Sequence, residues 1–436
     1  MILNNIDSAY VGADQAEKIY LGTEQIYPSG TPPEPSYEGE YFTIETLGNG
    51  DFYVRSEVPY YSINGGEWAH PLTGTPLSLN QGDKVRFKAT PNAKMSGLFS
   101  GNTLAFKVYG NIESLDYGDN FTGATQVKLA SGFTSYFYNC TGLTEAHNLV
   151  LPATTLANWC YYNMFMNCTS LISVPVLPAT ALIGNCYYCM FQGCTSLTSA
   201  PVLPATTLAS RCYSNMFHGC TSLTTAPALP ATTLAELCYE EMFSGCTSLT
   251  SAPVIPATAL TNSCYYQMFA YCTSLTTAPA LPATTLNSYC YNQMFMNCTS
   301  LISAPVLPAT ALIGNCYSGM FTNCTSLTSA PVLPATTLAN GCYDSMFSGC
   351  ASLTTAPELP AQALTTTCYR AMFRGCTNLT YIKCLVTNTS GTGGVFGPTG
   401  NWLAGVSPTG TFVKKAGVTW STGSSGIPSG WTVIEE

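Results

Sequence analysis

The sequence has few charged residues, and this scarcity excludes whole classes of function. Asp, Glu, Lys and Arg make up 8% of its 436 residues, whereas about 25% is usual in soluble domains. The formal net charge is −9, and it comes mostly from the two ends of the chain. Because no basic stripe is present, we expect no nucleic-acid binding.

Long hydrophobic runs are also absent. No stretch approaches 18 consecutive apolar residues, so we expect no segment to insert into a membrane. The first fourteen residues have neither the basic region nor the apolar region of a signal peptide. We therefore expect neither a signal peptide nor a membrane span.

Residues that carry chemistry are few and scattered. The three histidines lie far apart in the sequence, at His70, His147 and His218. A Cys-x-x-Cys pair occurs once, at Cys186 and Cys189, without the second pair that a zinc site needs. No glycine-rich phosphate loop is present. We expect no metal, no cofactor and no catalytic residues, and we therefore predict that the chain is not an enzyme.

What the sequence does contain is a tandem repeat of 26 residues. The unit is first complete at residues 151–176 and repeats head to tail as far as residue 376, with the pattern L-P-A-T-T-L-x-x-x-C-Y-x-x-M-F-x-x-C-T-S-L-T-x-A-P-x. Repetition at a fixed period of roughly 20–50 residues is typical of a solenoid. Since one coil cannot bury its own Leu, Met, Phe and Cys side chains, stacked coils are predicted to share one continuous core.

Two hydrophobic periods alternate inside each unit. Cys160, Met164 and Cys168 recur at every fourth position, which predicts a short helix with one apolar stripe. The prolines that follow cannot donate to a sheet, so any strand is predicted to be brief, near residues 171–174. Each coil is thus expected to contain a strand, a proline-bounded turn and a short helix.

The chain has 21 cysteines, most of them in two series that recur once per repeat. On a helix, Cys160 and Cys168 would lie roughly 12 Å apart, too far for a disulfide. Equivalent cysteines of successive coils are expected to point inward in parallel, so we favour buried thiols over a disulfide ladder. Such a set of thiols fits folding in the cytosol.

Several of these residues resemble the BspA-type leucine-rich repeat of bacterial surface proteins and of phages that infect gut bacteria. Leu177-Pro178 matches the start of the family pattern, Met190-Phe191 its Ala-Phe step, and Cys194 and Leu197 its later Cys and Leu. Cys186 departs from the usual Ile, and the coil is longer. The resemblance covers more than half of the chain. It implies a curved right-handed solenoid used in adhesion or recognition, and it supplies no catalytic residues.

The predicted fold is mostly β with short helices: a leucine-rich-repeat solenoid of 26-residue coils, preceded by a small β-sandwich and followed by a β-rich cap. We expect an N-terminal β anchor at residues 1–27, a linker at 28–40, a sandwich that serves as a spacer at 41–119, the solenoid at 120–383 and the cap at 384–436. The anchor is suggested by an echo of short strand-like runs around Tyr10-Val11-Gly12 and Tyr20-Leu21-Gly22. Its candidate residues are Tyr10, Gly12, Tyr20 and Gly22.

The repeat varies mainly at a few positions per coil, next to the predicted helix. These positions carry large aromatic residues and arginines, which are the residue types of binding hot spots. The candidate partner-binding residues are Trp159, Tyr188, Arg211, His218, Tyr266, Tyr271, Tyr289, Arg370 and Arg374. A row of Ser and Thr along the predicted strands forms a second exposed surface. The alternative for any single residue is ordinary solvated surface.

Together these features predict a non-enzymatic phage virion protein, a fibre or decoration with an adhesion or host-recognition domain. The expected partners are other virion proteins through the N-terminus, a glycan or protein of the host surface, and further copies of the chain. The expected location is the virion. The alternative is a leucine-rich-repeat adhesin on a bacterial cell surface.

Overall fold

The computed structural model describes residues 19–21, 24–26, 36–56, 59–72, 74–89, 96–127, 132–392 and 394–436. The chain divides into two units, Met1–Tyr37 and Glu38–Glu436. In the first unit β1 (Ile19–Leu21) and β2 (Glu24–Ile26) pair antiparallel, with Tyr20 opposite Gln25. Tyr20 therefore lies in a strand, whereas Tyr10, Gly12 and Gly22 lie outside the described residues.

The second unit begins with a mixed sheet in the order β10-β8-β3-β7-β5. Its antiparallel strands are β3 (Thr43–Thr46), β5 (Tyr60–Ile63), β7 (Lys84–Lys88) and β8 (Phe106–Asn111). A separate two-stranded sheet contains β4 (Gly50–Phe52) and β6 (Leu77–Leu79). After β5 the chain reverses at Asn64 and Gly65, which have φ of 49° and 79° and so suit a tight hairpin turn.

This sheet continues into the repeats. The second edge of β8 pairs in parallel with β9 (Leu143–Glu145) and β10 (Leu149–Val150). Between β8 and the repeats lie a short helix, α1 (Ser114–Tyr117), and a 3-10 turn, η1 (Gly118–Asn120). One buried apolar cluster runs from Phe42 to Trp431. Antiparallel strands thus lie where the sandwich was predicted, but their sheet and their buried core continue into the coils.

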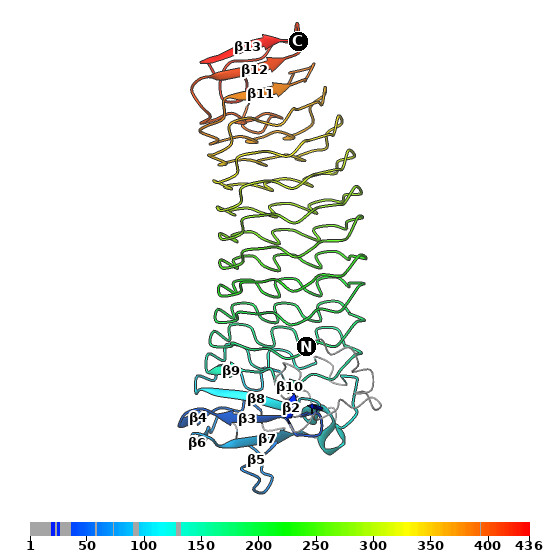
Figure 1. The fold of residues 1–436 in the computed structure, drawn as a ribbon, viewed down its shortest axis with the longest axis vertical. Helices are drawn as coiled ribbons and strands as arrows, with labels where there is room; N and C mark the ends of the chain where they lie inside the picture. Colours follow the sequence, from blue (N-terminus) through cyan, green and yellow to red (C-terminus); the bar gives the residue numbers. More distant parts are fainter. Residues whose placement is uncertain are drawn as a thin grey trace. The chain divides into compact units, whose positions relative to one another are not determined.

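Successive 26-residue coils lie on top of one another (Figure 1). Parallel bridges join equivalent residues of neighbouring coils, such as Ser199 with Thr225 and Thr225 with Ser251. A second row of bridges joins Thr155 with Ala181 and Ala181 with Thr207. In place of the strand predicted near residues 171–174, each coil has only such single bridges. The prolines two and five residues after the bridging Ser or Thr have no N–H to donate, so they cannot extend the ladder.

The short helix predicted in each coil is wrong. The segment forms consecutive tight turns in which every second N–H donates to the carbonyl three residues back, for example Cys212 to Ala209 and Ser214 to Arg211. The N–H groups in between donate to the next coil, as Tyr213 does to Cys238. A helix would instead direct every interior N–H to the carbonyl four residues back within its own segment.

Left-handed residues explain why these turns replace the helix. Arg211, Asn215 and Gly219 have φ of 55°, 57° and 72°, so one residue in every four is left-handed. Positive φ at the third residue of a turn is the type II geometry, which favours Gly and Asn. Residues repeated at every fourth position therefore face inward from a chain of turns as well as from a helix. The Asn or Gly before most of the second cysteines was the sequence signal for turns.

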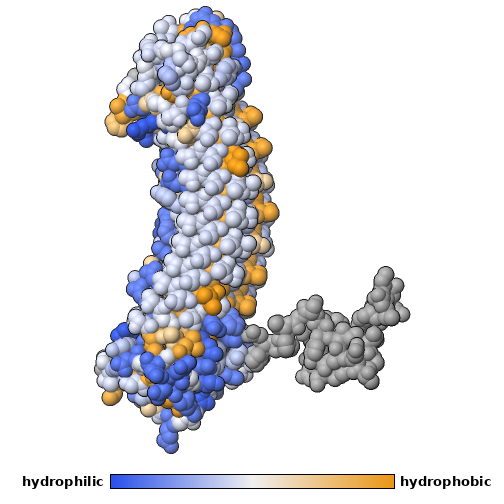
Figure 2. Space-filling view, turned by 60° about the vertical axis from the view of Figure 1, so that its left-hand side comes forward, coloured by the Kyte–Doolittle hydropathy of each residue, from blue (hydrophilic) through white to orange (hydrophobic). Residues whose placement is uncertain are grey.

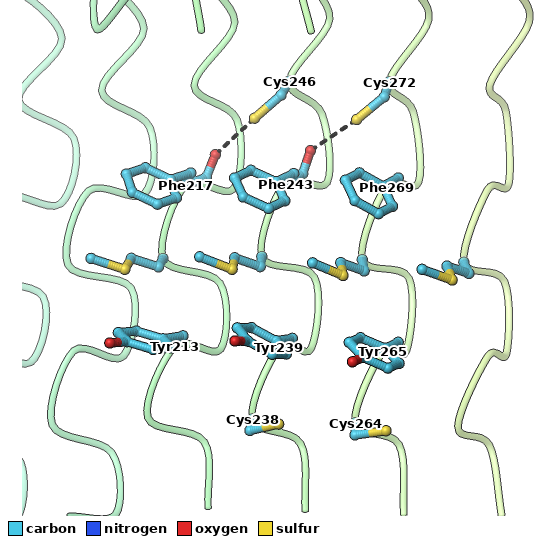
Figure 3. Close-up of a cluster of buried hydrophobic side chains, with 14 of the residues drawn as sticks. Tyr213, Phe217, Cys238, Tyr239, Phe243, Cys246, Cys264, Tyr265, Phe269 and Cys272 are labelled. Atoms are coloured by element: carbon cyan, nitrogen blue, oxygen red, sulfur yellow. Dashed lines mark hydrogen bonds between the residues drawn. The ribbon is translucent and has the colours of Figure 1, made fainter. Parts of the chain in front are cut away.

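The inward side chains form columns along the stack (Figure 3). In the Phe column, the ring centroids of Phe217 and Phe243 lie 5.7 Å apart and nearly parallel. In the Tyr column the centroids of Tyr213 and Tyr239 lie 6.0 Å apart. Each second cysteine donates its thiol hydrogen to a carbonyl of the preceding coil, as Cys246 Sγ does to Phe217 O over 3.1 Å. All 21 cysteines are buried and free, which confirms the preference for thiols.

The C-terminal end is a parallel sheet in the order β11-β12-β13. Its strands are β11 (Tyr381–Cys384), β12 (Gly410–Lys414) and β13 (Trp431–Glu435). The turn pattern continues beyond residue 383, since Phe373 N donates to Trp402 O and Gly375 N to Ala404 O. It also begins before residue 120, because Phe99 N donates to Tyr136 O. In the part of the chain that the structure describes, no helix is long and apolar enough to cross a membrane.

Candidate functional site

The candidate partner-binding residues lie on one surface, which we call the turn face: the outward side chains of the turn segments. Relative to the first cysteine of each coil, they fall into four columns. Trp159, Arg211 and Tyr289 precede it by one residue; Tyr188, Tyr266 and Arg370 follow it by two; His218 and Arg374 follow by six; Tyr271 follows by seven. Trp159, Tyr271 and Tyr289 are each exposed by more than two fifths.

An aromatic cluster marks the first coils of the turn face. The ring of Trp159 lies 5.1 Å from that of Tyr162 at an interplanar angle of 70°. Tyr162 in turn stacks on Tyr188 with centroids 5.2 Å apart. Sequence reasoning missed Tyr162, although it precedes Tyr188 by one repeat. These three rings offer a continuous partly exposed apolar surface, of the kind enriched at binding sites.

A polar cluster lies in the next coils of the turn face. Ser214 Oγ donates to Glu240 Oε2 over 2.9 Å. Burial raises the pKa of Glu240, opposed by this hydrogen bond and by the charge of Arg211. His218 Nδ1 lies 3.2 Å from Glu241 Oε2, an ion-pair distance without hydrogen-bond alignment. Acidic and basic groups thus lie close together here.

Cys189, the second cysteine of the lone Cys-x-x-Cys pair, lies between these clusters. It is 5% exposed, and burial raises the pKa of its thiol to about 12. Burial also raises the pKa of Tyr188 to about 12, with Cys189 and Glu240 adding to the effect. Among the described residues, no three His, Cys, Asp or Glu side chains gather as a metal site would need. Cys189 is therefore a packed thiol of the turn face.

Arg370 is engaged within the chain. Its Nε and Nη2 both donate to Asp344 Oδ2, at 2.8 and 2.6 Å. Asp344 occupies the same column one coil earlier, so the pair crosses neighbouring coils. A charge that is already paired contributes less to a partner, which makes Arg370 a weaker candidate than Arg211 or Trp159. The exposed Arg374 lies in the same coil.

Bulky residues occupy left-handed backbone positions on the turn face. Trp159, Arg211 and Tyr289 have φ of 64°, 55° and 55°. The same column holds Asn185 and Gly341 in other coils, which are the residue types that tolerate this conformation best. A side chain with a Cβ costs roughly 1–2 kcal/mol there. The left-handed backbone favours Asn or Gly, although Leu237, Ser263 and Thr367 also occupy this column at positive φ.

Two further rows lie outside the turn face. The Ser and Thr row follows the parallel bridges, and Ser199, Thr225 and Ser251 are exposed. A row of valines between the two prolines of the coil was missed by sequence reasoning and is visible as orange side chains along one edge in Figure 2. Its exposed members are Val176, Val202, Val254, Val306 and Val332.

Comparison with known families agrees with this arrangement of coils. Overlapping segments at residues 120–250, 160–302, 210–345 and 290–401 match the family described as BspA type Leucine rich repeat region. Since the matched residues span more than half of the sequence, the chain is a leucine-rich-repeat protein and belongs to the BspA-type family.

A solved structure of a leucine-rich repeat protein from Bacteroides ovatus ATCC 8483 is similar in part. It is 18% identical, the match covers 64% of this chain and 84% of that one, and the TM-score is 0.26. No curated protein matches the chain.

Proposed function

We propose that the chain is a non-enzymatic adhesion protein of a phage virion, a fibre or a decoration. Its leucine-rich-repeat solenoid presents the turn face to a glycan or a protein of the host surface. Residues 1–27 anchor it to other virion proteins, and several copies are carried on each particle.

The observation that carries this proposal is that large side chains of the turn face occupy backbone positions that are unfavourable for them. Trp159, Arg211 and Tyr289 each occupy a left-handed position that Asn or Gly fills elsewhere in the same column. Residues that destabilise a fold persist where they serve function. Aromatic residues and arginine supply most of the energy at binding surfaces. Repeated coils that carry such residues at some of their variable positions form a recognition surface on a constant scaffold.

The thiols favour a virion protein over an exported one. All 21 cysteines are free and buried, and unpaired thiols persist in reducing compartments. Phage particles assemble in the cytoplasm of the host, where such a protein folds without oxidation. A bacterial cell-surface adhesin, the second candidate, crosses more oxidising compartments. Mass spectrometry of purified phage particles and of a bacterial envelope fraction distinguishes the two.

Replacing Trp159, Arg211 and Tyr289 together by Asn is expected to separate stability from adhesion. Asn suits the left-handed backbone better, so the thermal midpoint should stay the same or rise. Binding of the fluorescently labelled protein to cells of gut bacterial strains should fall about tenfold or more, because the two aromatic side chains and the arginine of the turn face are lost. The measurements are a thermal melt and flow cytometry.

The matched control places Asn at Thr225, Ser251 and Thr277, which lie in the exposed Ser and Thr row. This variant should bind cells as the wild type does. Equal cell binding by the wild type and the turn-face variant would show that the turn face is not the recognition surface.

Deleting residues 1–27 is expected to leave a soluble, folded protein that no longer joins the particle. Short strands with unpaired edges complete a sheet on another chain through main-chain hydrogen bonds. Deleting the solenoid instead should spare incorporation and impair adsorption to cells. Occupancy is measured by mass spectrometry of purified particles. If the first truncation assembles at wild-type occupancy, the anchor lies elsewhere in the chain.

A further inference from the structure

A pocket of about 410 Å³ lies at the C-terminal end of the second unit. It is formed by β12, β13 and the chain between them. Its walls are Lys414, Val418, Thr419, Trp420, Thr422, Ile427, Pro428, Ser429, Trp431 and Val433. This volume lies within the range of about 300–1,000 Å³ that is usual for small-molecule sites. None of these residues belongs to the turn face.

The aromatic column of the coils ends at this pocket. Tyr369 stacks on Trp402 with centroids 6.3 Å apart, and Trp402 stacks on Trp420 at 5.4 Å. No further ring of the described residues stacks on Trp420. Trp402 does not line the pocket, so the pocket meets Trp420 away from the face that Trp402 covers. Phe412 also packs on Trp420, edge-to-face with centroids 5.5 Å apart, so a flat ring in the pocket meets only the part of Trp420 that Trp402 and Phe412 leave uncovered.

The polar groups around the pocket leave hydrogen bonds unmade. Trp420 is only 9% exposed, and its indole N–H has no partner within the described part of the chain. The indole N–H groups of Trp402 and Trp431, by contrast, donate to Gly426 O and Ser407 O. A buried donor without an acceptor is costly; because this nitrogen has almost no accessible surface, a ligand oxygen reaches it only when the chain around Trp420 shifts.

The pocket carries no free charge. Lys414 Nζ donates to Val418 O over 2.7 Å and pairs with the carboxylate of Glu435. The hydroxyls of Thr422 and Ser429 make no hydrogen bond within the described residues, so they remain available to a ligand. The walls thus combine two indole rings, aliphatic side chains and neutral hydroxyls, with one unused donor buried behind them.

We propose that this pocket binds a neutral sugar ring. The C–H face of a sugar packs on an aromatic ring, while its hydroxyls accept from an indole N–H and exchange hydrogen bonds with Thr and Ser hydroxyls. A purely apolar or aromatic side chain leaves the Trp420 N–H unsatisfied. An acidic sugar finds no free cation, because Lys414 is already paired.

The site is tested on the full-length protein with methyl glycosides of glucose, galactose, mannose, fucose and N-acetylglucosamine. Binding is followed by saturation-transfer NMR and by tryptophan fluorescence. At least one glycoside is expected to bind with a Kd of about 1–10 mM, which is usual for a single small ring. Failure of all five at 50 mM overturns the proposal.

Three variants locate the bound sugar. Ser429→Trp fills the pocket from an exposed position and should abolish binding. Thr432→Trp adds the same bulk on the opposite side of β13, between the lining residues Trp431 and Val433, and should change Kd by less than about twofold. Trp420→Phe keeps an aromatic face but removes the donor, and should weaken binding about 3- to 10-fold.

The outcomes separate this site from the turn face. Unchanged binding by Ser429→Trp, or equal loss in Thr432→Trp, shows that the sugar is held elsewhere and overturns the proposal. The turn-face variant with Asn at Trp159, Arg211 and Tyr289 should bind the sugar as the wild type does. Loss of sugar binding in that variant assigns the sugar to the turn face instead. The proposal for the pocket therefore stands or falls independently of the adhesion proposal.

Discussion

Replacing Phe191 by alanine is expected to lower the free energy of unfolding by about 3–5 kcal/mol. Phe191 is fully buried, and its ring stacks on Phe165 at 5.4 Å and on Phe217 at 5.7 Å. Its N–H donates to Met216 O in the next coil. Because backbone hydrogen bonds of this kind hold the coils at a fixed spacing, the neighbouring rings have little freedom to close the cavity.

The loss is measured as the shift of the chemical denaturation midpoint. The matched control is Phe396→Ala, which removes the same side chain from a position that is 77% exposed; it should change stability by less than about 0.5 kcal/mol. Because each coil contacts mainly its neighbours, the cavity should loosen the adjacent coils first. A Phe191→Ala protein that unfolds like the wild type would show that the Phe column does not support the stack.

The inward residues could be predicted from the sequence because the repeat constrains them. Coils of constant length place Phe191, Cys194 and Leu197 above their equivalents in every neighbour, so one pattern defines the whole core. The same pattern did not distinguish helix from turns. Cys186, Met190 and Cys194 lie four residues apart, a spacing that satisfies both. Only the recurrent Asn and Gly at left-handed positions separate the two, and their meaning depends on the hydrogen bonds between coils.

The backbone and contacts of the candidate residues could not be predicted from the sequence. Variation within a constant repeat identified Trp159 and Arg211, but not that their backbone is left-handed, since Asn or Gly occupies that column in only some coils. The pairing of Arg370 with Asp344 follows from an offset of one repeat and was still missed. The pocket at Trp420 lies outside the repeat, where no periodic pattern relates β12 to β13.

The cysteines of the native protein are expected to be silent toward thiol reagents at pH 8. Burial raises the pKa of Cys220 and Cys238 to about 12 and that of Cys316 to about 11. The thiolate is the reactive form, so a protonated, inaccessible thiol does not react. Alkylation followed by mass spectrometry should find no labelled cysteine before denaturation and all 21 labelled after it. Fewer than half of the 21 free after denaturation would contradict a core of thiols.

The same thiols should make the fold sensitive to alkali. In the unfolded chain a thiol has a pKa of about 8.5, and burial raises this pKa in the folded protein. The stabilising contribution is therefore complete below about pH 8 and is lost as the pH rises toward the folded value. Each buried thiol then lowers the free energy of unfolding by about 1.4 kcal/mol per pH unit.

Because the thiols of neighbouring coils ionise together on unfolding, the thermal midpoint should fall steeply between about pH 9 and pH 11. Circular dichroism melts across this range measure the fall. Cys220→Ala removes one ionising group, so the slope of its unfolding free energy against pH should be shallower by about 1.4 kcal/mol per pH unit. The buried tyrosines add to the alkaline loss in both proteins, so the difference between the two slopes isolates the thiol. Identical slopes would mean that Cys220 is not a protonated thiol in the folded protein. Its Sγ could then not donate the hydrogen bond to Phe191 O.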